Sequence, residues 1–119
     1  MNNLMSQEIK DLAGALAKAQ GEFETAKKDA SNPFFKSKYA DFESIVEACR
    51  SKLAKYGLCF VQQTEFDGEK LILTTTLLHS SGQWICGKYP VLTQKNDPQG
   101  FGSAISYAKR YALAALLGV

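Results

Sequence analysis

The sequence predicts an α+β domain in which a three-stranded antiparallel meander packs against a long C-terminal helix, with two helices before it. Three observations predict this class. Apolar residues recur at steps of three and four between residues 5 and 26, strand-like runs with tight turns fill residues 58–92, and a capped helical pattern occupies residues 97–117. The 119 residues are 45% hydrophobic and 22% charged, which is typical of a single soluble domain spanning the whole chain.

The first helix is expected from about Ser6 to Lys28. Its apolar stripe consists of Met5, Ile9, Leu12, Leu16, Ala19, Phe23 and Ala26. Gly14 and Gly21 each weaken a helix by about 1 kcal/mol relative to Ala. The helix therefore needs a partner surface, either in its own domain or on another subunit.

A loop from Asp29 to Ala40 follows, because the residue before Pro33 is pushed out of the helical region. The second helix should begin at Asp41, whose carboxylate caps the first turn, and end at Tyr56, with Gly57 as its left-handed stop. The predicted buried stripe is Phe42, Ile45, Cys49, Leu53 and Tyr56.

Two strands, Leu58 to Phe66 and Lys70 to His79, flank Asp67-Gly68, a dipeptide that favours a tight hairpin turn. Ser80-Ser81-Gly82 then turns into a third strand, Gln83 to Leu92. Both faces of the middle strand carry apolar side chains, so it should be central, with helices covering one face of the sheet.

The last helix begins with Asp97 as N-cap and Pro98 at the first helical position, and runs to about Leu117. Its predicted core face is Phe101, Ile105, Ala108, Ala112 and Leu116. Leu113 and Leu117 fall outside that face, which predicts a second buried contact with a neighbouring subunit.

Composition narrows the function classes. Fourteen Lys and Arg against twelve Asp and Glu give a net charge of +2, too mild to indicate nucleic-acid binding by itself. The apolar runs are too short for a membrane span and the N-terminus lacks a secretion signal, so we expect a cytoplasmic protein without a membrane partner. Cys49, Cys59 and Cys86 lack metal-ligand spacing and are predicted to be small buried hydrophobes.

Catalytic motifs are weak, and we predict no enzyme, no metal and no cofactor. His79 stands alone at a strand end, and Gly100-Phe101-Gly102 lacks the preceding strand and the third glycine of a dinucleotide loop. Glu43, Glu47 and Arg50 share one face of the second helix, which favours a solvated salt-bridge row over a catalytic carboxylate pair.

Nucleic-acid binding has more support, because cations hold phosphates and aromatic rings stack on bases. The candidate residues are Lys36, Lys38, Tyr39, Lys88, Lys95, Gly102, Ser106, Lys109 and Arg110. Gly102, Ser106 and Lys109 share a line along the last helix, whereas Lys109 and Arg110 point about 100° apart, so at most one aims at any given spot. These cations could instead only solubilise the loop or cover apolar surface.

Two alternatives remain at this level: a double-stranded RNA-binding module and a purely structural oligomer. The order of two helices, three strands and a helix resembles that RNA-binding module. The module needs cations at the start of its last helix, where this chain has the acidic Asp97.

Four segments carry a family resemblance: Asn32–Asp41, Leu53–Leu58, Thr76–Trp84 and Lys95–Tyr111. In these segments the sequence resembles the ERF (essential recombination function) family of phage single-strand annealing proteins, and the similarity extends over Leu12 to Val119.

The resemblance implies a β-β-β-α core like that of the eukaryotic annealing recombinases, assembled into homo-oligomeric rings. It implies binding and annealing of single-stranded DNA without ATP, in phage homologous recombination and DNA repair. Lys109 and Arg110 match the cationic pair of the DNA groove, with Lys36 and Lys38 next. A host single-strand-binding protein is a further implied partner, although the family's variable C-terminal tail is missing after Gly118-Val119.

Overall fold

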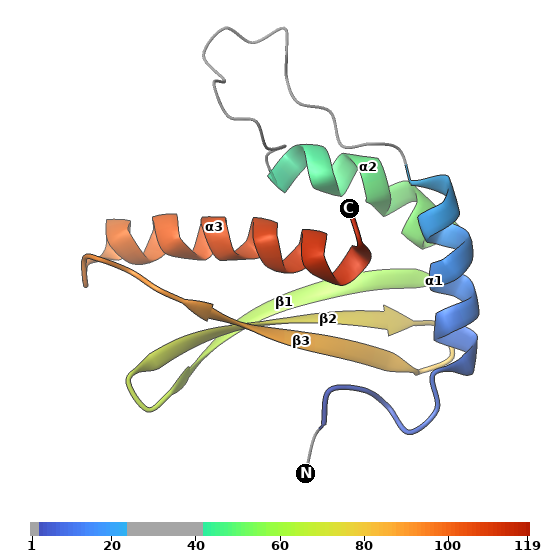
Figure 1. Cartoon of the computed structure of the whole chain (residues 1–119), viewed down its shortest axis with the longest axis horizontal. Helices are drawn as coiled ribbons and strands as arrows, with labels where there is room; N and C mark the ends of the chain where they lie inside the picture. Colours follow the sequence, from blue (N-terminus) through green and yellow to red (C-terminus); the bar gives the residue numbers. More distant parts are fainter. Residues whose placement is uncertain (1–2, 24–41) are drawn as a thin grey trace, which may run out of the picture.

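The computed structural model of the chain describes residues 3–23 and 42–119. These residues form three helices and one three-stranded antiparallel sheet, which confirms the predicted α+β class and element order. The elements are α1 (Lys10–Glu22), α2 (Phe42–Lys55), β1 (Leu58–Asp67), β2 (Lys70–His79), β3 (Trp84–Val91) and α3 (Pro98–Leu117). Figure 1 shows α3 running along one face of the sheet and α1 crossing the end at which β1 begins.

The sheet has the strand order β1-β2-β3, so β2 is central as predicted. The strand ends differ from the prediction by at most one residue. Asp67 pairs with Lys70, so the centre of the first turn is Gly68-Glu69, where Gly68 takes a φ of +64°. Glycine reaches this left-handed region without the penalty that a Cβ would bring.

Alternation along β2 divides the sheet into two faces. Leu71, Leu73, Thr75 and Leu77 are buried under the helices. Ile72, Thr74, Thr76 and Leu78 point to the opposite face and are half-buried. In Figure 1, α2 and α3 lie on one side of the sheet and α1 crosses its end, so the prediction of one helix-covered face is correct.

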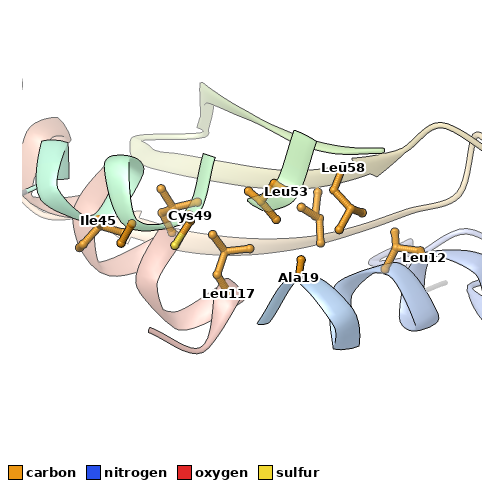
Figure 2. Close-up of a cluster of buried hydrophobic side chains, with 10 residues drawn as sticks. Leu12, Ala19, Ile45, Cys49, Leu53, Leu58 and Leu117 are labelled. Carbon is orange, nitrogen blue, oxygen red and sulfur yellow. The ribbon is translucent and has the colours of Figure 1, made fainter. Parts of the chain in front are cut away.

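The larger hydrophobic core joins the three helices to the end of the sheet where β1 begins. Its buried members are Leu12, Ala19, Ile45, Ala48, Cys49, Leu53, Leu58, Leu77, Leu113 and Leu117. Figure 2 shows Leu12 and Ala19 of α1, Cys49 and Leu53 of α2, and Leu117 of α3 within this cluster. The partner surface of α1 therefore lies in its own domain, which was one of the two alternatives.

A smaller core lies between the first half of α3 and the other end of the sheet. It contains Leu71, Leu73, Val91 and Ala108. The two cores fix α3 along its length, because full burial of an aliphatic side chain contributes about 1.5–3 kcal/mol.

The first helix is shorter than predicted. At its start, Met5 forms an isolated antiparallel bridge with Ile85, and the Ser6 N–H donates to the Trp84 carbonyl at 2.8 Å. At its end, Phe23 is extended with a ψ of 131°. The outer edge of β3 offers unpaired backbone groups, and these bonds to residues 4–6 replace a helical turn.

The second helix ends one residue before the predicted Tyr56, and its predicted left-handed stop at Gly57 is confirmed. α2 stops at Lys55, and Gly57 has a φ of +74°. The Gly57 carbonyl accepts a hydrogen bond from the Ser80 N–H at 2.9 Å, which links the start of β1 to the end of β2. The predicted cap Asp41 and the Asp29 to Ala40 loop lie outside the described residues.

The predicted outward position of Leu113 and Leu117 is wrong. Both side chains are 0% exposed and belong to the larger core. The second half of α3 is buried on two sides, against the sheet and against the larger core with α2 and α1, so these leucines give no reason to expect a neighbouring subunit there.

The cysteine prediction is confirmed for Cys49, which is 0% exposed, and wrong for Cys59. Cys59 is exposed and Cys86 is half-buried. Strand alternation explains the difference, because the neighbouring Leu58 points into the core and sends Cys59 to the uncovered face.

Candidate nucleic-acid interface

Helix α3 carries both cations of the candidate pair, and its start is fixed as the sequence predicts. The Asp97 carboxylate accepts a hydrogen bond from the Gly100 N–H at 2.6 Å, and Pro98 occupies the first turn. A Cβ on Gly100 would lie 2.3 Å from the Lys95 carbonyl oxygen, so only glycine fits there. The helix ends at Gly118, which has a φ of +76°.

Lys109 lies on the flank of α3 that faces β1 and α2. Its Nζ is 4.7 Å from the centre of the Phe42 ring, within the range of a cation–π contact. Its carbonyl accepts a hydrogen bond from Gln62 Nε2 at 3.1 Å, and the same nitrogen donates to the buried Thr75 hydroxyl at 3.0 Å. The helix backbone at Lys109 is therefore fixed against the sheet, while the side chain stays half-exposed.

Arg110 lies against a pair of tyrosines. Its guanidinium carbon is 4.8 Å from the Tyr107 ring centre and 4.9 Å from that of Tyr111. The two phenol oxygens are 3.0 Å apart. This hydrogen bond raises the pKa of Tyr107 and lowers the pKa of Tyr111, which the Arg110 charge lowers further.

The Arg110 side chain is half-buried. Its Nε is buried and has no hydrogen-bond partner among the described residues. The ring centres of Tyr107 and Tyr111 are only 4.6 Å apart, so Arg110 packs beside both rings, an environment that suits phosphate binding and base stacking. Lys109 and Arg110 thus have different neighbours, as their predicted angular separation requires.

The predicted line along α3 is solvent-accessible. Gly102 and Ser106 are exposed, and Lys109 follows them on the same flank. A Cβ on Gly102 would meet no atom within 4 Å, so the described residues leave open space beside it. This flank offers close backbone approach, a hydroxyl and a cation in succession.

Lys88 and Lys95, the other candidates that the structure describes, do not lie on this flank. Lys88 is exposed on β3, on the sheet face away from the helices, because its neighbour Tyr89 packs on the helix side. Lys95 borders a cavity of about 610 Å³ between β3, residues 92–97 and α3. Lys36, Lys38 and Tyr39 lie outside the described residues.

A family model of the ERF superfamily matches residues 12–119. The chain belongs to the ERF superfamily. This confirms the resemblance and its predicted extent over Leu12 to Val119. No curated protein and no solved structure matches the chain.

Catalytic features of this ERF superfamily member are few in the described part of the chain. His79 accepts a hydrogen bond from the Ser81 N–H at 3.1 Å and so stabilises the turn after β2, as expected for a lone turn histidine. Within residues 3–23 and 42–119, no group of three or more His, Cys, Asp or Glu side chains could hold a metal. In the same ranges no helix has the length and apolarity needed to cross a bilayer.

Sequence reasoning missed the aromatic partners of the cations. Tyr107 could have been found, because Arg110 and Tyr111 follow it by three and four residues on one helix, and side chains at these spacings are neighbours. Phe42 could not, since it reaches Lys109 from another element.

The predicted salt-bridge row is also wrong. Arg50 lies 5.7 Å from the Phe60 ring centre instead of pairing with Glu43 or Glu47. Among the described residues, the ion pairs join Lys52 and Lys55 to Glu22.

Proposed function

We propose that this protein binds single-stranded DNA along α3 and anneals it to a complementary strand, as a homo-oligomer and without ATP. Membership of the ERF superfamily supports a role in recombination-related strand annealing. The observation that carries the proposal is the pairing of both α3 cations with aromatic rings on an accessible helix surface.

The chemistry of annealing supports these residues. A strand must be held by its phosphates while its base edges stay open, so sequence-neutral cations are useful and tight base readout would obstruct pairing. Gly102, Ser106 and Lys109 offer such contacts in series. A subunit with a net charge of only +2 benefits from assembly, because each added copy contributes another set of cations to the same strand.

The test is Lys109→Ala combined with Arg110→Ala. We expect a folded protein with much weaker binding to a labelled oligonucleotide, measured by fluorescence anisotropy. The salt dependence should flatten by about 0.7 in log–log slope for every phosphate contact removed. Lys10→Ala combined with Lys18→Ala removes the same charge from exposed positions on α1 and should change binding little.

Annealing is measured separately, with two complementary labelled strands and no ATP. The double variant should lose annealing in proportion to binding. Equal loss in both double variants would show that net charge, rather than the α3 surface, controls DNA binding. A preference for duplex RNA over single-stranded DNA in direct competition would favour the RNA-binding alternative instead.

A further inference from the structure

The tip of the β1–β2 hairpin carries an exposed aromatic ring among acids. Phe66 is 65% exposed, although most phenylalanines are buried in folded domains. It points to the helix side of the sheet, since it alternates in phase with Gln62, which contacts α3. Glu65 and Asp67 are its neighbours in the strand and point to the opposite face, and Glu69 lies in the turn that follows; all three are exposed.

The opposite lateral edge of the sheet carries a cavity of about 610 Å³. Its lining includes Tyr89, Leu92, Tyr107 and Ala104, with Lys95 at its border. Leu92 is 84% exposed, so the apolar lining continues to the surface. A cavity of about 150 Å³ already accommodates benzene, so a phenyl ring fits with room to spare.

The ring and the cavity lie at the same end of the sheet. Phe66 pairs with Leu71, and Leu71 pairs with Val91, the residue before Leu92. Figure 1 shows the hairpin tip and the end of β3 at this same end. Because the two features occupy opposite edges at one level, a second copy placed beside the first brings its Phe66 to the cavity.

Side-chain docking suits this edge better than addition of a strand. The outer edge of β3 is already bonded at Trp84, to Ser6, and at Cys86, whose N–H donates to the Leu4 carbonyl at 2.7 Å. Pro90, further along the same edge, has no N–H to offer. The backbone groups that stay free on the outer edge of β3 are therefore too few to pair with a strand of another copy.

Charge is complementary across the same contact. Glu65 and Asp67 point to the uncovered face of the sheet, and Lys88 points to that same face on the receiving edge, while Lys95 borders the cavity. The nearby carboxylate of Asp97 is engaged by the start of α3. Opposite charges on two distinct surfaces favour a head-to-tail contact, which repeats from copy to copy.

We propose that Phe66, on the acidic β1–β2 hairpin tip of one copy, inserts into the cavity between β3 and α3 of the next copy. This rests on the homo-oligomer in the proposed function and names the surfaces that build it. The contact is heterologous, so successive copies form a ring or an open filament.

Light scattering after size exclusion gives the first test. The parent should be an oligomer at micromolar concentration, and Phe66→Ala should raise the concentration at which it dissociates at least tenfold. Val61→Ala is the matched control, because Val61 is 39% exposed on the same strand but points to the other face. Circular dichroism should show both variants folded. An unchanged assembly for Phe66→Ala would overturn the proposal.

Directed cross-linking gives the second test. Phe66→Cys and Leu92→Cys are combined with Cys59→Ser and Cys86→Ser, while the buried Cys49 is kept. Oxidation should give a ladder of dimers, trimers and larger species on a non-reducing gel. Within one chain the two positions are two strands apart, about 10 Å, which is too far for a disulfide. A mixture of the two single-cysteine proteins should stop at dimers.

The outcomes separate the two proposals. A parent that is monomeric with and without DNA would overturn both this contact and the assembly part of the proposed function. An oligomeric parent that gives no ladder would overturn the Phe66 contact alone. A cavity that holds a base of DNA instead would leave assembly unchanged in Phe66→Ala and lower DNA affinity in Leu92→Ala, which also overturns the contact.

Discussion

Replacing Leu113 by alanine tests whether the second face of α3 belongs to the core of its own domain. The side chain is 0% exposed and packs with residues of α2 and the sheet. The substitution removes three carbon atoms, worth about 2.4 kcal/mol at about 0.8 kcal/mol per buried methylene. The cavity left behind adds to this, so we expect a loss of about 3–4 kcal/mol in the free energy of unfolding.

Urea and thermal unfolding followed by circular dichroism measure this loss. At about 4 °C per kcal/mol for a domain of this size, the midpoint should fall by about 12–16 °C. Leu92→Ala removes the same atoms from a side chain that is 84% exposed in the single chain, and at concentrations too low for assembly it should change stability by less than about 0.5 kcal/mol.

Protein concentration distinguishes the two origins of burial. If Leu113 is covered by its own domain, the free energies of unfolding of Leu113→Ala and the parent should differ by the same amount at protein concentrations a hundredfold apart. If a neighbouring subunit covered it, the difference would grow as the assembly forms. A loss below about 1 kcal/mol, or one that varies in this way, would refute the assignment of Leu113 to the domain core.

Two further substitutions test local contacts. Asp97→Ala removes the cap bond to Gly100 and should cost about 1 kcal/mol in urea unfolding, while Asp97→Asn should retain most of that stability. Glu22 accepts hydrogen bonds from Tyr56 and Lys55, which lower its pKa below the usual 4.5. The stabilisation is therefore present above pH 4.5 and lost as the pH falls through the lowered pKa, so the urea midpoints of the parent and Glu22→Gln should differ by a constant amount above pH 4.5 and converge as the pH is lowered further.

The β-meander and α3 could be predicted because local chemistry specifies them. Strand ends coincide with residues that favour turns, such as Gly68 and Gly82, and both have a positive φ. The first turn of α3 is specified by a cap and a proline within four residues, and its end by Gly118. These signals act within a few residues and need no knowledge of the rest of the chain.

The predictions that were wrong concern residues whose conformation or burial depends on an element far away in the sequence. The apolar pattern continues through Met5, but the free edge of β3 offers the N-terminal segment hydrogen bonds that a helical turn cannot match. The pattern on α3 contains two apolar faces, and sequence alone does not reveal that α2 covers the one with Leu113. Cys59 is exposed because of its phase in β1, which Leu58 sets from the core.

At the candidate site, helical spacing predicted that Lys109 and Arg110 point in different directions, but it did not predict which side chains each of them contacts. Each cation packs against a different aromatic surface, so the two are not equivalent. Tyr107 also lines the cavity proposed to receive Phe66, so a docked neighbour would place its acidic hairpin tip close to the Arg110 flank.

In this arrangement a neighbouring copy occupies the flank of α3 that carries Tyr107, and DNA occupies the flank that carries Lys109. A neighbour docked beside Tyr107 leaves Gly102, Ser106 and Lys109 open, because they lie on the flank that faces β1. DNA binding would then depend most on Lys109, whereas Arg110 would contribute to both assembly and DNA affinity. Lys109→Ala alone should therefore weaken DNA binding without changing particle size, while Arg110→Ala should change both. Equal effects of the two single variants on both measurements would contradict this division of α3.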